Sequence, residues 1–72
     1  RRAEIVEARQ ISIYLCRDIL GSSLASIGMH FSGRDHTTVL HACKVIDGKM
    51  KKNKRVSGII SDIKSELSIV LA

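Results

Sequence analysis

Apolar residues recur at helical spacing in four stretches of the chain, and polar or small residues separate one stretch from the next. These stretches cover residues 4–20, 24–31, 35–50 and 57–71. Within each of them an apolar side chain returns every three or four positions, which is the period of an amphipathic helix. The pattern therefore predicts an all-α fold, a small helical bundle in which residues 1–72 form a single domain.

The side chains on these stripes are the expected core. In the first two stretches they are Ala8, Ile11, Leu15, Ile19, Leu24, Ile27 and Phe31. In the third and fourth they are Val39, Ala42, Cys43, Ile46, Met50, Ile59, Ile60, Ile63, Leu67, Val70 and Leu71. A chain of 72 residues buries only ~60% of the surface that its unfolded form exposes, so this core is small.

Glycine and capping residues mark where one predicted helix ends and the next begins. Gly21 is a usual helix stop, and Ser23 is a good N-cap for the short second helix. Gly33 breaks the pattern again, and Asp35 can cap the third helix. A short helix, a tight turn containing glycine and a second helix make the helix-turn-helix pattern. The run of cations over residues 49–55 is expected to be a loop or a frayed helix end.

Composition narrows the class of protein. Lys and Arg outnumber Asp and Glu by 12 to 7, which gives a net charge of +5. This balance favours anionic, phosphate-rich partners, although a merely solvated basic surface gives the same count. Cys16 and Cys43 form no C-x-x-C pair and are expected to be buried thiols of a reduced, cytosolic chain. No apolar run reaches the ~18 residues of a membrane span, and the opening Arg1-Arg2 without an initiator Met indicates a piece of a longer protein.

The third predicted helix has a polar face opposite its apolar stripe. An advance of ~100° per residue places there Thr37, His41, Lys44 and Gly48. The major groove of DNA admits one α-helix, and short polar side chains near the N-terminus of that helix read base edges. An aspartate can accept from the cytosine amino group, a histidine can reach guanine or a thymine carbonyl, and a threonine methyl can pack on the thymine methyl. The residues that carry this chemistry are Asp35, His36, Thr37 and Thr38.

Phosphate contacts are expected around the same helix. The free N–H groups and the dipole at its N-terminus attract anions, and Arg34 strengthens that field. His41 and Lys44 lie further along the polar face and can reach bases or flanking phosphates, while Ser23-Leu24 offers a second anchor at the start of the short helix. The alternative is that the polar residues at the start of the third helix only cap and solvate it, because capping signals are common.

The sequence offers no catalytic or cofactor site. Both cysteines fall on or beside core stripes, so structural thiols are favoured over nucleophiles. The set of His30, His36, His41 and Cys43 matches no structural zinc spacing. The chain has no Gly-rich phosphate loop for a nucleotide. We therefore expect a binding module that is not an enzyme and that holds no metal or cofactor.

Residues 33–43, which read GRDHTTVLHAC, resemble the signature of the C-terminal DNA-binding domain of the DnaA family of bacterial replication initiators. Shorter matches at residues 9–11, 14–17, 23–24 and 27–28 resemble the first long helix and the first helix-turn-helix element of that family. The resemblance covers residues 9–47 most strongly. The chain departs from the family at Ala8, where proline is common, and at Glu4 and Glu7, which interrupt a usually basic segment.

The resemblance implies sequence-specific binding of double-stranded DNA at A/T-rich origin boxes, in support of the initiation of chromosomal replication. It implies base contacts in the major groove from Asp35, His36, Thr37 and Thr38. It implies a minor-groove contact from Arg1, in a loop ahead of the first helix. The contacts that it implies with the DNA backbone, or for Arg9 with a base or the backbone, are those of Arg9, Arg17, Ser23, Leu24, Arg34 and His41. Lys44 joins this group by its place on the polar face.

Two other functions stay open on the pattern alone. A helix-turn-helix transcription regulator would share the motif, and a helical protein-interaction module could use the same polar face, although such modules favour larger apolar or aromatic anchors. The isolated domain is expected to be a monomer in the cytoplasm, at the bacterial nucleoid. The resemblance implies that the longer parent protein binds ATP and self-assembles through regions outside these 72 residues.

Overall fold

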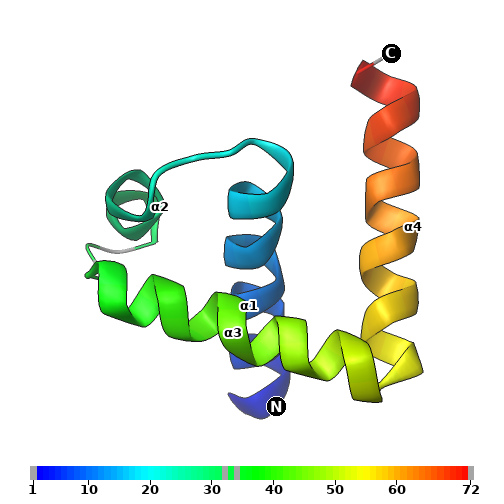
Figure 1. Cartoon of the computed structure of the whole chain (residues 1–72), viewed down its shortest axis with the longest axis horizontal. Coiled ribbons are helices and arrows are strands. Elements are labelled where there is room, and N and C mark those ends of the chain that lie inside the picture. Colours follow the sequence, from blue (N-terminus) through cyan, green and yellow to red (C-terminus); the bar gives the residue numbers. More distant parts are fainter. Residues whose placement is uncertain (1, 32, 34, 72) are drawn as a thin grey trace.

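The computed structural model describes residues 2–31, 33 and 35–71, and these form four α-helices. The helices are α1 (Arg2–Ile19), α2 (Leu24–His30), α3 (His36–Lys52) and α4 (Lys54–Leu71). In Figure 1, α3 crosses the view in front of α1, α2 is seen nearly end-on beside the start of α3, and α4 rises from the far end of α3. The all-α prediction is confirmed, with each of the four helices in the expected order.

Two apolar clusters on different sides of α1 hold the helices together. One contains Ile11, Ile46, Val56 and Ile60, from α1, α3 and α4. The other contains Ile13, Ile27, Val39 and Ala42, from α1, α2 and α3. Ile11 and Ile13 are two positions apart, so they point ~200° away from each other around the helix. Helix α1 is therefore covered from two sides, by α4 on one and by α2 with the start of α3 on the other.

This arrangement corrects the predicted core of α1. Ile13, only 1% exposed, lies off the single stripe expected from the sequence, whereas Ala8 of that stripe is exposed to solvent. The sequence predicts a single stripe because most surface helices bury only one face. The stripe of α3 is confirmed, since Val39, Ala42 and Ile46 are all buried.

The corner between α3 and α4 also differs from the prediction. Residues 49–55 are helical except Asn53, so the expected loop is a joint of one residue. Asn53 Oδ1 accepts the amide hydrogens of Arg55 at 2.9 Å and Val56 at 3.4 Å and so caps the start of α4. Lysines in the last turn of α3 suit its negative dipole end. The cationic run is thus compatible with helix, and Val56, which was not expected in the core, is fully buried.

The far end of α4 is less covered than its sequence predicts. Ile60 is buried, and Ile63 and Leu67 are half-buried, as the stripe requires. Val70, which was expected on the apolar face, is 77% exposed, and so is Ile69. Figure 1 shows why, because this end of α4 extends away from the rest of the molecule.

The predicted turns and caps around α2 are confirmed. Gly21 and Gly33 have φ of 64° and 68°, a left-handed conformation that glycine adopts without a Cβ clash. Ser23 caps α2 by accepting the Ser26 amide hydrogen at 3.1 Å. The short α2, the glycine turn and α3 thus form a helix-turn-helix, in which α2 and the first half of α3 share the cluster around Ile13.

Candidate nucleic-acid interface

The first half of α3 presents a polar face to solvent. His36, Thr37, His41 and Lys44 are all exposed. The opposite side of the same helix is fixed in the core by Val39, Ala42 and Ile46. Because the buried side fixes how the helix is rotated, the polar face has a defined direction. The structure thus brings the residues predicted on this helix onto one exposed surface.

Asp35 has a structural task at the head of this surface. Its Oδ1 accepts the Thr38 amide hydrogen at 2.9 Å and the Thr38 hydroxyl hydrogen at 3.1 Å. These two hydrogen bonds hold the pKa of the Asp35 carboxyl below its usual range. The carboxylate therefore stays charged, and the capping role that the sequence left open as an alternative is observed.

Arg17 and the start of α2 form a second group. The Arg17 Nη1 donates a hydrogen bond to the Ser22 carbonyl at 2.8 Å, which brings the guanidinium to the turn before α2. The exposed Ser23 hydroxyl accepts from Ser26 but keeps its own hydrogen as a donor. Leu24 is half-buried against the cluster around Ile13, so any contact that it makes with phosphate has to come from its backbone.

Helix α1 separates its charges onto two flanks. Advancing ~100° per residue places its arginines, Arg2, Arg9 and Arg17, on the flank that carries Ile13. The same count places its acids, Glu4, Glu7 and Asp18, on the flank that carries Ile11. Two of these acids pair within the fold, Glu7 with Lys49 and Arg55, and Asp18 with Lys64. None of the three arginines has a carboxylate partner in the part of the chain that the structure describes.

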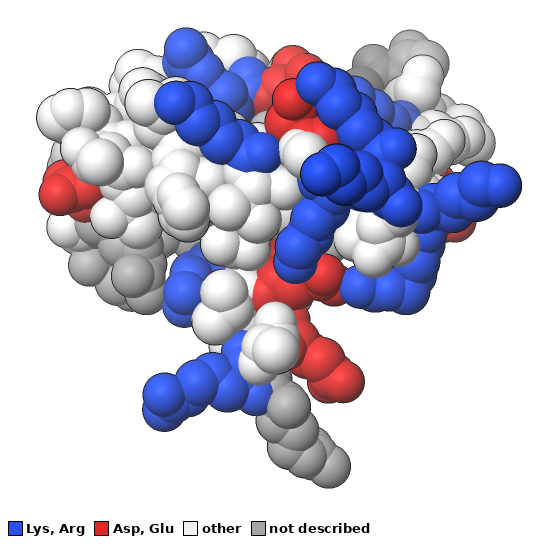
Figure 2. All heavy atoms as spheres, turned by 60° about the horizontal axis from the view of Figure 1, so that its bottom comes forward, with Lys and Arg blue, Asp and Glu red and all other residues white. Residues whose placement is uncertain are grey.

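The basic run at the α3–α4 corner is partly neutralised. Figure 2 shows Lys and Arg side chains gathered there with carboxylates among them. Arg55 Nη2 lies 2.8 and 3.0 Å from the two Glu7 oxygens, and Lys49 Nζ lies 3.1 Å from one of them. Lys51 pairs with Asp47. The hydrogen bonds from Arg55 and Lys49 hold the pKa of the Glu7 carboxyl below its usual range. Together with the Lys51–Asp47 pair, they leave fewer cations at the corner for a phosphate than the sequence suggests.

Two of the predicted contact residues, Arg1 and Arg34, lie outside the described residues. The loop expected ahead of the first helix is helical from Arg2, so the prediction that α1 begins near residue 4 is wrong by one half-turn. Arg2 was not among the predicted contacts, yet it shares a flank with Arg9. Their separation of seven residues, close to two helical turns, is the signal in the sequence that could have found it.

Both cysteines lie at the edge of the apolar cluster around Ile13. Cys16 and Cys43 are half-buried rather than fully buried, and burial raises the pKa of the Cys43 thiol, which disfavours the nucleophilic thiolate. Among residues 2–31, 33 and 35–71, no three His, Cys, Asp or Glu side chains are grouped so that they could hold a metal ion. No helix in the described part of the chain has the length and apolar character needed to cross a membrane.

The part of the chain that forms this surface is similar to a known protein family. Residues 1–46, which include the helix-turn-helix and the polar face of α3, match the model of the family described as bacterial dnaA protein helix-turn-helix. The chain belongs to this family. The match makes the domain a DNA-binding helix-turn-helix module of the DnaA type, without catalytic machinery, and confirms the resemblance.

Individual DnaA proteins are similar over nearly all of the chain. The chromosomal replication initiator protein DnaA of Lactococcus lactis subsp. cremoris is 52% identical over 64 residues, which are 89% of this chain and 14% of that protein. The DnaA protein of Bifidobacterium animalis subsp. lactis is 45% identical over 67 residues, 93% of this chain and 12% of its own length. The DnaA protein of Chlorobaculum tepidum is 39% identical over 70 residues, which are 97% of this chain and 14% of that protein. No solved structure matched the chain. The chain thus spans about an eighth of the length of the DnaA relatives it matches.

Proposed function

We propose that this DnaA-type domain binds double-stranded DNA at replication-origin boxes and thereby supports the initiation of chromosomal replication. The observation that carries the proposal is the polar face at the start of α3, where exposed short side chains stand opposite a buried stripe that fixes their direction. A helix of this kind enters the major groove with its N-terminal residues toward the base edges.

Four residues carry the base readout in this proposal. Thr37 and His36 are exposed and reach the base edges directly, Thr37 through its methyl group and hydroxyl. Asp35 caps α3 through Oδ1 and has Oδ2 to accept a hydrogen bond from a cytosine amino group. The Thr38 hydroxyl donates to Asp35, so its methyl group and its remaining acceptor capacity are what it offers to a base.

The DNA backbone is held on both sides of this helix. On α3, His41 and Lys44 follow the readers along the exposed face, and Lys44 has no carboxylate partner among the described residues. On the other side are Arg17, the Ser23 hydroxyl and the amide of Leu24 at the start of α2. Arg9, half-buried and also without a carboxylate partner among the described residues, is a further contact from α1. Phosphate contacts of this kind fix the position of the domain on DNA without selecting a sequence.

Arginines complete the proposed interface. Arg34 precedes the N-terminus of α3, where a cation strengthens the attraction for phosphate. Arg1 is the proposed minor-groove contact, and Arg2 on the flank of Arg9 gives the same end of α1 a second positive charge.

The remaining proposals concern the longer protein. We propose that residues 1–72 are one monomeric DNA-binding domain of a longer initiator that acts on the bacterial nucleoid in the cytoplasm. ATP binding and self-assembly then belong to the parts of that initiator beyond this chain, since the domain is about an eighth of its relatives.

The experiment that tests the function is fluorescence anisotropy of a labelled duplex that carries one DnaA-type box, against a scrambled duplex of equal composition, at two salt concentrations. We expect tighter binding to the box that persists at the higher salt, because base contacts are less salt-dependent than phosphate contacts. Equal binding to both duplexes, lost together at high salt, would contradict the proposal. A requirement for two boxes in one duplex would instead favour a dimeric transcription regulator.

A further inference from the structure

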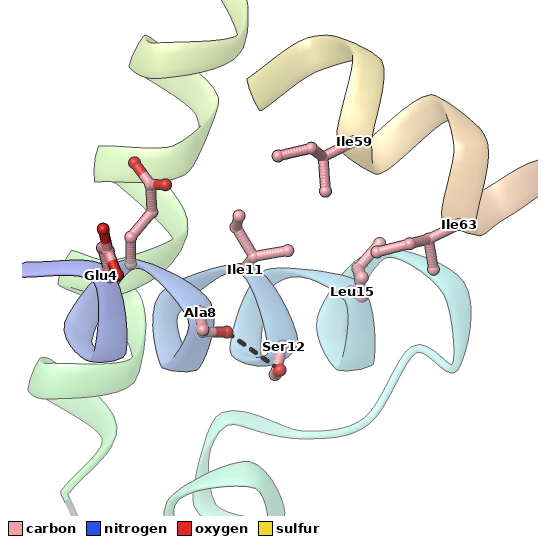
Figure 3. Close-up of a pocket in the computed structure, with 8 residues that line it drawn as sticks. Glu4, Ala8, Ile11, Ser12, Leu15, Ile59 and Ile63 are labelled. Atoms are coloured by element: carbon pink, nitrogen blue, oxygen red, sulfur yellow. Dashed lines mark hydrogen bonds between the residues drawn. The ribbon is translucent and has the colours of Figure 1, made fainter. Parts of the chain in front are cut away.

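An apolar groove runs between α1 and α4, on the flank of α1 that faces away from its arginines. Figure 3 shows Ile11 and Leu15 of α1 pointing toward Ile59 and Ile63 of α4 across a hollow. Ala8 and Ser12, both exposed, line the same side of α1 as that hollow. The hollow has a volume of about 310 Å³.

The groove continues past this hollow. Leu15 also lines a second, wholly apolar hollow of about 190 Å³ together with Cys16, Ile19, Leu20 and Leu67. The two hollows follow the stripe of Ala8, Ile11, Leu15 and Ile19, which α4 covers only in part because its far end leaves the bundle (Figure 1). From Glu4 to Leu20 the stripe is ~24 Å long, since a helix rises ~1.5 Å per residue. That length matches about four turns of a helix laid along it.

Carboxylates border this groove, although the chain as a whole has a net charge of +5. Glu4 and Glu7 line it on α1. On α4, Asp62 and Glu66 are exposed and lie ~60° and ~20° around the helix from Ile59. Lys49 and Arg55 more than offset the charge of Glu7, whereas the three carboxylates of Glu4, Asp62 and Glu66 have no cationic partner among the described residues and outweigh that excess. The border is therefore negative.

We propose that this groove binds a basic amphipathic helix of a partner protein. Apolar side chains of that helix, spaced three and four residues apart, would occupy the two hollows, and Lys or Arg on its flank would face Glu4, Asp62 and Glu66. At the groove itself these carboxylates repel an anionic lipid surface, so the local charge favours a basic protein segment. The exposed apolar end of α4 in a second copy is also unsuitable, since the last turn of α4 has no basic residue.

The groove and the proposed DNA-binding surface lie on different sides of the domain. The arginines of α1 lie with Ile13 toward α2 and the start of α3, whereas Ile11 and the groove face α4. A partner in the groove therefore leaves the polar face of α3 exposed, and the inference does not depend on the proposed DNA contacts.

The probe is a fluorescent synthetic peptide of about 16 residues, with Leu at the positions of one helical stripe and Lys on both flanks. Two control peptides have the same length. In one the order of residues is scrambled so that the stripe is lost, and in the other Glu replaces every Lys. We expect saturable binding of the basic peptide, weakened at least about tenfold in either control, because both apolar contact and charge are required.

Protein variants locate the binding. Ala8→Lys places a cation on an exposed position of the groove, and Ser61→Lys places the same charge on an exposed position of α4 that points away from it. We expect Ala8→Lys to weaken binding of the basic peptide at least about tenfold and Ser61→Lys to leave that binding nearly unchanged. Melting temperature and binding to box DNA, which neither position is proposed to touch, show that both variants fold.

Three results would overturn the proposal. They are equal binding of the Lys and Glu peptides, equal effects of the two lysine variants, and a concentration-dependent dimer in sedimentation that Ala8→Lys abolishes. The last of these would assign the groove to a second copy of the domain. Failure of box binding in the wild-type domain would contradict the proposed function and leave the peptide result unaffected.

Discussion

Thr38 binds Asp35 twice through the same carboxylate oxygen, with its amide at 2.9 Å and its hydroxyl at 3.1 Å. Neither of these two hydrogen bonds from Thr38 uses the other oxygen of Asp35. Capping the helix and contacting a base therefore do not compete for the same atom. The two interpretations that the sequence left open, a helix cap and a base reader, are compatible in one side chain.

Replacing Asp35 should separate these two roles. We expect Asp35→Ala to lower the melting temperature by a few degrees, because α3 loses its N-cap, and to weaken box binding. Asp35→Asn retains a capping oxygen and should melt nearly as the wild type does, while its binding to the box falls because the acceptor charge is lost. Thermal unfolding followed by circular dichroism and duplex anisotropy measure the two effects. Normal box binding by Asp35→Asn would show that Asp35 is only a cap.

Thr37 and Lys44 occupy the same exposed face but should affect binding differently. We expect Thr37→Ala to reduce the binding free energy for the box by about 1–3 kcal/mol and to leave that for the scrambled duplex almost unchanged, because it removes a base contact. Lys44→Met should weaken binding to both duplexes alike, because it removes a phosphate contact. It should also reduce the slope of log K against log salt by about 1. Salt titrations with both duplexes distinguish the outcomes. If Thr37→Ala lowers both affinities equally, Thr37 does not read sequence.

Glu7 links residues that are 42 and 48 positions away in the chain, through Lys49 and Arg55. We expect Glu7→Gln to lower the melting temperature, because both pairs join the start of α1 to the α3–α4 corner. The same substitution should slightly strengthen binding to scrambled DNA and steepen its salt dependence, because two cations are released. Glu4→Gln is the matched control, since Glu4 is exposed and has no cationic partner among the described residues. Similar melting temperatures for the two variants would show that the pairs add nothing to stability.

The effect of Glu7 should also depend on pH. Its cations hold the pKa of the carboxyl below its ordinary value of 4.5. A group with a lowered pKa stabilises the fold above its ordinary pKa, and this contribution is lost as the pH falls through the lower, folded-state value. The difference in melting temperature between wild type and Glu7→Gln should therefore be full near neutral pH and disappear in acid below pH 4.5. A difference that persists undiminished in strong acid would assign it to packing rather than to charge.

Asn53 is the single residue that separates α3 from α4. We expect Asn53→Ala to destabilise the domain by about 1 kcal/mol, because the amides of Arg55 and Val56 lose their acceptor. Asn53→Asp retains an accepting oxygen at this position and should be nearly as stable as the wild type. Urea unfolding of the three proteins gives the comparison. A fully stable Asn53→Ala would mean that the corner is fixed by the burial of Val56 alone.

Much of the fold follows from local rules that a single sequence displays. The stripe of α3, the caps Ser23 and Asp35 and the left-handed Gly33 were all predictable, because each depends on residues within one or two helical turns. The polar face of the candidate interface was predictable for the same reason, since it is the complement of that stripe.

The errors arose where distant parts of the chain decide the outcome. Ile13 joins the core only because a second layer covers the other side of α1, and no local period reports that layer. The cations of residues 49–55 suggested a loop because their partner Glu7 lies far away in the sequence. Asn53 was the missed local clue, since asparagine is among the best helix caps.

The two flanks of α1 have a consequence for how the domain meets DNA. The three arginines on one flank of α1 have no carboxylate partner among the described residues, whereas the three carboxylates of α1 lie on the other flank and only Glu7 and Asp18 are paired. This helix therefore has an electric dipole moment across its axis, in addition to the net charge of the domain. In the field of a duplex such a molecule experiences a torque, which turns the arginine flank and the start of α3 toward the phosphates before any atom touches. The encounter is then oriented, so a larger share of collisions begins near the bound pose. This advantage shrinks as salt shortens the reach of the field, which is only ~10 Å at 0.1 M ionic strength.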